Sequence, residues 1–291
     1  PGAGTARCSG AMEYDEFVYW ATESRLWRVT VAGADDSWAS AAVNGGVTTG
    51  WNTFTETDAA YHPMAIQDLQ LWIGDANLVA SVNSAGTFTA NRLDLNEPHR
   101  IRSMIAYELD LLIGTFIAAT VSRAGVFRWD TVSPSWNTYD EVDEVGVNAF
   151  IRDDNFVYAQ CGRGGRIYFY NGEKLEPYKR IPGTWNSTSY GEVYPNSVSK
   201  YLGRPIFGLS NGSGNPAEQG VYTLGSYSRD YPKVLDLSWV ISQNTTSGLE
   251  IGAIIVEDFN LMVAWKDGAN YGVDAISTTA KYGSAQLDTM V

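Results

Sequence analysis

The chain has 291 residues, of which 44% are hydrophobic and 18% are charged, and this composition excludes a disordered polypeptide. Acidic residues outnumber basic ones by 33 to 20, so the net charge of −13 disfavours nucleic acid and anionic lipid as partners. The most apolar stretch, residues 109–121, contains Asp110 and is too short to cross a bilayer. We therefore expect no nucleic-acid partner and no membrane insertion.

A short apolar strand that ends in a small residue recurs along the chain. The small residues lie between 40 positions apart (Gly74 to Gly114) and 56 positions apart (Gly208 to Ala264), which is close to the length of a four-stranded propeller blade. Most copies are followed by a further strand in which apolar and polar residues alternate. The six copies are Phe17–Ala21, Leu71–Gly74, Leu111–Gly114, Phe156–Ala159, Ile206–Gly208 and Leu261–Ala264.

Turn signals separate these strands, and Asn171-Gly172 is typical of a tight β-hairpin. No segment has a sustained helical apolar period. The sequence therefore predicts an all-β fold, a β-propeller of about six or seven four-stranded blades, as a single domain over residues 1–291. Because the chain begins without Met and its end lacks a terminal turn or polar tail, we expect it to be a piece of a longer polypeptide.

The repeated strand is interpreted as the inner strand of each blade, buried on both faces between neighbouring blades. Acidic residues precede several copies, as at Asp15-Glu16 and Asp153-Asp154, and are interpreted as polar turns between blades. The two cysteines, Cys8 and Cys161, are far apart in sequence. Whether they form a long-range disulfide is left open.

Motifs for catalysis and metal binding are weak. Residues 208–212 match the G-x-S-x-G pattern, but Asn215-Pro216 follows where a helix should begin, so we interpret them as a strand that enters a loop. His62 and His99 are the only histidines, lie outside any metal-binding spacing and are expected in loops. The sequence assigns no catalytic residue, no metal site and no cofactor.

Two other functions remain open. A propeller glycosidase would need two carboxylates that face each other across the axis, and acids lie near several repeated strands. A lectin-like module would need exposed aromatic rings. The loop aromatic residues proposed to contact a ligand, each set among Asn, Ser, Thr and Gly, are Trp51, Trp136, Trp185 and Tyr190.

The second half of the chain resembles the propeller domains of tail-associated proteins of tailed bacteriophages. The resemblance rests on residues 165–176, 179–183, 207–217 and 220–222, and it extends weakly to Gly283. It implies a non-enzymatic virion component, with an extracellular-type location in the tail. The partners that it implies are other tail proteins or a host surface protein or glycan, and a homo-oligomer is compatible with this role.

Overall fold

The structure is a computed structural model that describes residues 9–30, 51–56, 59–117, 124–154, 156–162, 165–181, 191–211, 220–225, 234–240, 249–257, 259–277 and 287–290. These residues form strands and turns, and none of them is helical. The chain divides into two compact units, Pro1–Gly146 and Val147–Val291, which we describe in turn. The prediction of one domain stays a prediction.

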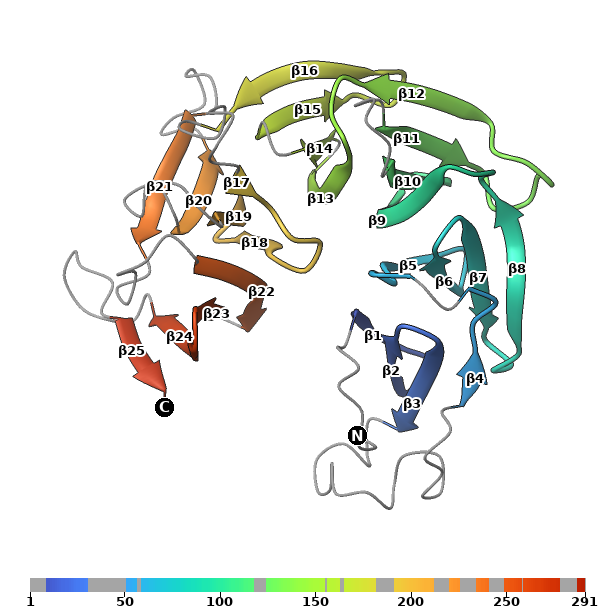
Figure 1. Cartoon of the computed structure of the whole chain (residues 1–291), viewed down its shortest axis with the longest axis horizontal. Coiled ribbons are helices and arrows are strands. Elements are labelled where there is room, and N and C mark those ends of the chain that lie inside the picture. The colour runs from blue at the N-terminus through green and yellow to red at the C-terminus, as the bar shows by residue number, and fades with distance from the viewer. Residues whose placement is uncertain are drawn as a thin grey trace. The chain divides into compact units, whose positions relative to one another are not determined.

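The first unit contains three antiparallel sheets whose strands lie side by side in chain order (Figure 1). The first sheet consists of β1 (Gly10–Tyr14), β2 (Phe17–Thr22), β3 (Arg25–Thr30) and β4 (Asn52–Thr53). The second consists of β5 (Met64–Gln67), β6 (Gln70–Asp75), β7 (Leu78–Asn83) and β8 (Phe88–Asp94). The third consists of β9 (His99–Tyr107), β10 (Asp110–Ile117), β11 (Ala124–Trp129) and β12 (Thr138–Val142).

The second unit repeats this pattern with three further antiparallel sheets. The fourth sheet consists of β13 (Val147–Asp153), β14 (Phe156–Cys161), β15 (Arg166–Tyr170) and β16 (Leu175–Arg180). The fifth consists of β17 (Gly191–Glu192), β18 (Val198–Tyr201), β19 (Arg204–Asn211), β20 (Gly220–Gly225) and β21 (Val234–Val240), and both β17 and β18 pair with β19. The sixth consists of β22 (Leu249–Glu257), β23 (Asn260–Asp267), β24 (Asn270–Ser277) and β25 (Leu287–Met290). The predicted all-β propeller architecture with about six blades is confirmed.

The repeated apolar strand is the second strand of every sheet, with a hydrogen-bonded neighbour on each side. This agrees with the interpretation of the repeated strand as an inner strand, and a further strand that the pattern did not show precedes it in each sheet. The copy Phe156–Ala159 in the fourth sheet is predicted to end one residue too early. The pairing of Asp153 with Phe156 makes Gln160, and not Ala159, the counterpart of Gly74 and Gly114.

Two-residue turns join the repeated strand to the strand before it, as between β1 and β2, β5 and β6, β9 and β10, and β18 and β19. Asp15 and Glu16 both have positive φ (48° and 65°), as do Asp68 and Leu69 (50° and 55°). This conformation matches the right-handed twist of the flanking strands in a tight hairpin. The prediction that the acidic pairs form turns between blades is therefore wrong, because these residues turn the chain within one sheet.

The core lies between the faces of adjacent sheets. In the first unit, Tyr19 of β2 lies in one cluster with Leu71 and Ile73 of β6, and Trp72 of β6 lies in another with Leu111 and Ile113 of β10. All six side chains are buried. Successive residues of a second strand thus pack alternately against the preceding and the following sheet, which explains why these strands are continuously apolar.

The second unit has the same arrangement. Tyr158 of β14 lies in one cluster with Phe207 and Leu209 of β19, and Ile206 of β19 lies in another with Leu261 and Val263 of β23. The rings of Phe207 and Tyr222 stack with centroids 5.6 Å apart. The packing therefore repeats at equivalent positions of the two units.

Glycines in the second strands let the next sheet approach closely. A Cβ atom at Gly74 would lie 2.7 Å from Cγ2 of Ile101 on β9. A Cβ atom at Gly208 would clash with Cγ2 of Ile251 on β22. A small residue is required here because an isoleucine of the next sheet occupies the space that a side chain would need.

We expect Gly208→Ala to lower the free energy of unfolding by about 1–3 kcal/mol, because the added methyl group overpacks the contact with Ile251. In an Ile251→Ala background the same substitution should cost less, because Cγ2 and Cδ1 of Ile251 are gone and only its Cβ atom, at 2.8 Å, remains close to the added methyl group. Urea denaturation of the four proteins measures this coupling. An equal cost of Gly208→Ala in both backgrounds would contradict the proposed packing.

His62 is fully buried, so the prediction that it lies in a surface loop is wrong. Its Nδ1 atom lies 2.7 Å from the Gly74 carbonyl oxygen and its Nε2 atom 3.3 Å from that of Glu23. Its ring stacks on Phe54 with centroids 4.1 Å apart. His99, also expected in a loop, is the first residue of β9. Both histidines have a structural place in the first unit.

Burial lowers the pKa of His62 below its ordinary value, although nearby carbonyl groups oppose this shift. The neutral ring is therefore favoured by folding, and its contribution to stability is fully present above about pH 6.5 and is lost as the pH falls below that value. We expect the urea midpoint to fall between pH 8 and pH 5.5, and to fall less in His62→Asn. An equal fall in the variant would show that His62 is not responsible.

Candidate functional site

One end of each sheet carries the turn between its first two strands and the loop between its last two, because the strands are antiparallel. We call this end in the first unit the hairpin end. It comprises the turns Asp15-Glu16, Asp68-Leu69 and Glu108-Leu109 and the loop from Asp130 to Asn137. Loops at one end of a rigid propeller are the usual place for a binding site.

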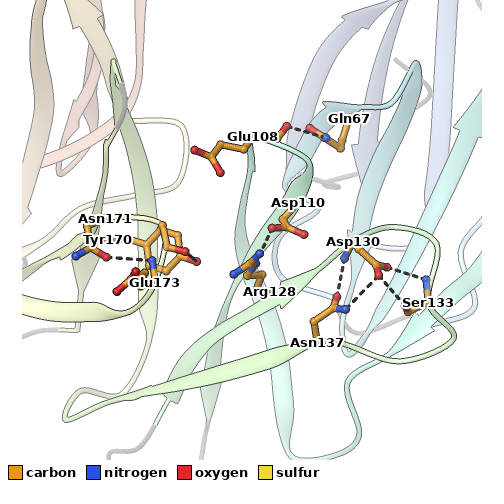
Figure 2. Close-up of polar contacts among 11 residues, drawn as sticks. Gln67, Glu108, Asp110, Arg128, Asp130, Ser133, Asn137, Tyr170, Asn171 and Glu173 are labelled. Atoms are coloured by element: carbon orange, nitrogen blue, oxygen red, sulfur yellow. Dashed lines mark hydrogen bonds and ion pairs between the residues drawn. The ribbon is translucent and has the colours of Figure 1, made fainter.

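Hydrogen bonds between neighbouring sheets hold these turns in place. The Tyr14 hydroxyl donates to the Leu69 carbonyl oxygen at 2.6 Å. Nε2 of Gln67 donates to the Glu108 carbonyl oxygen at 3.1 Å, as Figure 2 shows. Each donor is the last residue of the first strand in its sheet. The turns of the hairpin end are therefore linked to one another.

Burial, with the nearby negative charge of Asp15, raises the pKa of Tyr14, so its hydroxyl stays protonated and remains a donor at neutral pH. The Thr131 hydroxyl adds a further link by donating to Oδ2 of Asp68 at 3.2 Å. The loop of the third sheet is thus joined to the turn of the second sheet. The hairpin end is preorganised by contacts between sheets as well as within them.

Large aliphatic side chains project from these turns. Leu69 is 81% exposed and Leu109 is 76% exposed, and Val132 is also exposed. The carboxylate residues Asp68 and Glu108 precede the two leucines and are exposed as well. Apolar side chains on fixed turns, bordered by negative charge, are suited to bind a surface that is apolar at its centre and basic at its rim.

The Asp130 carboxylate organises the loop between β11 and β12. It accepts hydrogen bonds from the Ser133 backbone N–H and hydroxyl groups and from Nδ2 of Asn137 (Figure 2), and from the Val132 N–H. These bonds, led by those of Ser133, hold the pKa of Asp130 well below its usual range. The carboxylate is fixed as a structural acceptor, and this fixes the position of Val132.

Asp110 lies at the start of β10, next to the Glu108-Leu109 turn, and pairs with Arg128 of β11 through Nε and Oδ2 at 2.5 Å (Figure 2). This carboxylate is largely buried, and the guanidinium group compensates its charge. The ion pair joins the second and third strands of the sheet beneath the turn. It supports the hairpin end and does not leave a carboxylate available for chemistry.

The second unit has turns of the same design. The Tyr201 hydroxyl donates to the Phe259 carbonyl oxygen at 2.9 Å, and the side chains of Leu202 and Phe259 are exposed. Nζ of Lys200 donates to Oδ1 of Asp154 at 2.7 Å, and this contact lowers the pKa of Asp154. Apolar residues on turns linked between sheets are thus a repeated feature of the fold.

Polar side chains also shape the loop after β15 in the second unit. Oδ1 of Asn171 accepts hydrogen bonds from the N–H groups of Glu173 and Lys174, and the Tyr170 hydroxyl donates to the Gly172 carbonyl oxygen (Figure 2). Gly172 has a φ of 99°, which favours glycine. A hairpin is present at Asn171-Gly172 as predicted, but the prediction of a tight turn is wrong, because residues 171–174 form the loop and Asn171 does not have a positive φ.

Two of the four predicted ligand contacts are described by the structure. Trp136 lies in the loop of the hairpin end, is 36% exposed and packs against Phe127 and Tyr139. Trp51 is half-buried against Tyr19 and lies under the Arg28 guanidinium group. Trp51 packs against the cluster that contains Tyr19, whereas Trp136 contacts Phe127 of another cluster. Trp185 and Tyr190 lie outside the described residues.

Sequence reasoning missed Leu69 and Leu109. Each stands two residues before a repeated strand, separated from it by Gln70 or Asp110, so the apolar pattern gave no reason to single it out. The signal that could have found them is the two-residue spacing between consecutive strands, in which Asp or Glu occupies the first turn position. This spacing makes the following leucine a turn residue and not a core residue.

The part of the chain that the structure describes holds no group of three His, Cys, Asp or Glu side chains suited to a metal ion. Ser210, from the G-x-S-x-G match, is buried on β19 and accepts a hydrogen bond from the Ile251 N–H at 2.7 Å. Burial raises the pKa of Asp274, which accepts a hydrogen bond from Trp265 and is fully buried. Ser210 and Asp274 therefore both hold neighbouring strands together.

Cys161 is buried on β14, and its thiol lies 3.6 Å from the Ala159 carbonyl oxygen. Its proposed partner, Cys8, lies outside the described residues, so the disulfide stays an open question. Among the described residues, no helix has the length and apolar character needed to cross a membrane.

No known family model matches the sequence, and comparison with curated proteins finds no significant match. Among solved structures, the fold is similar to two crystal structures of the extracellular domain of BT4673 from B. thetaiotaomicron. The identities are 16% and 15%, the TM-scores 0.58 and 0.56, and each match covers 96% of this chain. The chain spans 33% of the length of that domain.

The fold is also similar to the computationally designed protein Ika8, with 11% identity and a TM-score of 0.56. This match covers 97% of the present chain and 73% of the designed one. At such identities the likeness concerns the fold alone. It supports the propeller architecture that the sheets define.

We expect Tyr14→Phe to lower the free energy of unfolding by about 1 kcal/mol, because the Leu69 carbonyl oxygen loses its donor from the neighbouring sheet. Tyr139→Phe is the matched control, since the Tyr139 hydroxyl makes no hydrogen bond to the described residues, and its cost should be within about 0.5 kcal/mol of zero. Urea denaturation measures both. Equal effects of the two substitutions would argue against a link between the sheets through Tyr14.

Proposed function

We propose that the chain is a non-enzymatic structural and binding module of a tailed-phage virion, and that the hairpin end of its first unit contacts another tail protein. The resemblance of the second half of the chain to tail-associated propellers supports a location in the virion tail. The net charge of −13 is compatible with a protein partner. Glycans or proteins of the host surface remain as alternative partners of this chain in the virion.

The observation that carries the proposal is the exposure of Leu69 and Leu109 on turns that are linked between sheets. Ordering a mobile side chain or loop reduces affinity, so groups that are already fixed bind more tightly. Aliphatic side chains give little to a sugar, which stacks on flat rings, but they fill pockets on protein surfaces. A protein is therefore favoured as the partner.

A lectin-like function is the second candidate, and one observation favours it. Trp136 is partly exposed, and its ring lies against Phe127 and Tyr139, with centroid distances of 5.3 Å and 6.5 Å. A ring held in this way is suited to stack on a sugar. The glycosidase alternative gains no comparable support, because Asp110 is paired with Arg128 and Asp274 is buried.

The location is tested by immunogold electron microscopy and mass spectrometry of purified virions from the source of the chain. We expect the label on the tail and peptides of the chain in the particle fraction. Label that is absent from particles, with all peptides in the soluble fraction, would overturn the virion assignment. A glycan-hydrolysis screen runs alongside, and turnover that a single Asp or Glu substitution abolishes would establish the enzyme instead.

The binding surface is tested with the recombinant chain and immobilised tail proteins from dissociated virions. We expect the double variant Leu69→Asp, Leu109→Asp to bind at least about tenfold more weakly, because the charges must be desolvated at an apolar contact. Tyr271→Asp is the control, since Tyr271 is 82% exposed on the last sheet. Equal binding by the wild type and both variants would exclude the hairpin end.

The same recombinant proteins distinguish a lectin-like function from binding to a tail protein. A glycan array is measured with the wild type, with Trp136→Ala and with the leucine double variant. Glycan binding that only Trp136→Ala abolishes, without binding to tail proteins, would replace the proposed function by sugar recognition. Tail-protein binding that requires the leucines, with no glycan signal, is the result that we expect.

A further inference from the structure

Four aromatic side chains adjoin one another on one face of the fourth sheet. The Phe169 ring on β15 lies 4.9 Å from the Phe156 ring and 5.7 Å from the Tyr158 ring, both on β14, measured between centroids. It lies 6.0 Å from the Tyr178 ring on β16. These side chains therefore cross three adjacent strands of one sheet (Figure 1). We call them the aromatic patch.

The fifth sheet covers only part of the aromatic patch. Tyr158 is buried and Phe169 is half-buried, and both pack in the cluster that contains Phe207 of β19. Phe156 is 41% exposed and Tyr178 is 38% exposed. Single exposed apolar residues are common on protein surfaces, whereas adjoining ones mark a contact surface. The exposed part of the patch is therefore suited to bind a partner.

The border of the aromatic patch is basic. Nζ of Lys179 lies 5.1 Å from the centre of the Tyr178 ring, and Arg180 beside it is exposed. Between residues 147 and 181, basic residues outnumber acidic ones by six to four, whereas acidic residues outnumber basic ones by 33 to 20 in the whole chain. The six basic residues are Arg152, Arg163, Arg166, Lys174, Lys179 and Arg180.

Lysines also neutralise acidic groups near the patch. Nζ of Lys200 lies 2.7 Å from Oδ1 of Asp154, which precedes Phe156 by two residues. Nζ of Lys174 lies 2.6 Å from Oε1 of Glu176 on β16. Because each of these carboxylates has a cation beside it, neither adds much negative field to the border.

The hairpin end of the first unit has the complementary character. Leu69 and Leu109 are apolar and exposed, and the acidic residues Asp68 and Glu108 border them. A partner for this surface needs an apolar centre and a basic rim, and the aromatic patch has both. Opposite charges at the two rims favour this contact, whereas two like rims would repel each other. One chain thus carries both halves of a contact.

We propose that the hairpin end of one copy of the chain binds the aromatic patch of a second copy. The inference rests on the proposed function, and it identifies the tail protein bound at the hairpin end as another copy of the chain. Because the two surfaces differ, each copy can bind one neighbour through its hairpin end and one through its patch. Copies therefore assemble as a reciprocal dimer, a closed ring or an open chain.

The test uses two variants that each remove one surface. The double variant Leu69→Asp, Leu109→Asp blocks the hairpin end. The double variant Phe156→Glu, Tyr178→Glu blocks the aromatic patch. In sedimentation velocity we expect the wild type to associate as its concentration rises, and each variant alone to associate at least about tenfold more weakly. An equimolar mixture of the variants should form dimers and no larger species, because one surface of each kind remains.

Two further proteins serve as controls. Tyr271→Asp should associate as the wild type does, since Tyr271 is 82% exposed and lies outside both surfaces. Lys179→Glu reverses a charge at the border without removing a ring, so it keeps the test decisive if the ring substitutions impair folding, which urea denaturation monitors. We expect Lys179→Glu to weaken association, and added salt to weaken association of the wild type. Unchanged association in both cases would contradict a basic border.

Each other result overturns the inference. A wild type that stays monomeric at every concentration would show that the two surfaces do not bind each other. Association that neither double variant reduces would place the contact elsewhere on the chain. A monomeric chain that captures a different tail protein through Leu69 and Leu109 would leave the proposed function standing and contradict the inference alone. Association through both surfaces in a chain that is absent from virions would overturn the virion assignment alone.

Discussion

Packing of one sheet face against the next is the interaction on which the rest of this structure depends. The strands β6 and β19 each have a sheet on both sides, so in β6 Leu71 and Ile73 face one neighbour while Trp72 faces the other. An interior strand in this position cannot alternate between apolar and polar residues. It also needs a small residue where the next sheet approaches, as at Gly74 and Gly208. Continuous apolar strands and recurrent small residues are two consequences of the same constraint.

The position of the proposed binding surface follows from this packing. Because the sheets are held by their faces, the turns at their ends are free to vary in sequence without loss of the core. The same turns are fixed in position by donors at strand ends, Tyr14 and Gln67 in the first unit and Tyr201 in the second. This combination places exposed leucine side chains on a rigid support. It is the physical basis for the proposed binding role.

The sequence predicts the parts of the fold that depend on burial from both sides. The second strands were found because interior packing makes them apolar throughout, and their spacing gave the number of sheets. The first strands were missed because they carry charged residues, such as Arg100 and Arg102 in β9, and therefore lack a clear apolar pattern. Gln160, a large polar residue where other sheets have Gly or Ala, shifted one copy by a residue.

The candidate site was harder to predict for a related reason. Leu69 and Leu109 follow an acidic residue and precede an apolar strand, so composition alone assigns them to the core. Their exposure depends on where the chain turns, and the turn is fixed by pairing with a first strand that the pattern did not show. Trp136 was placed in a loop correctly, but its partial burial against Phe127 depends on tertiary packing that the sequence does not display.

The central claim is that the second strands, held between two sheets, are the most stable part of the fold. Hydrogen exchange of the 291-residue chain, followed by mass spectrometry, tests it most directly. The account predicts that amides of β6, β10 and β14 exchange last, and that those of β8, β12 and β16 at the sheet edges exchange much earlier. Exchange of the second strands as early as the edge strands would contradict it.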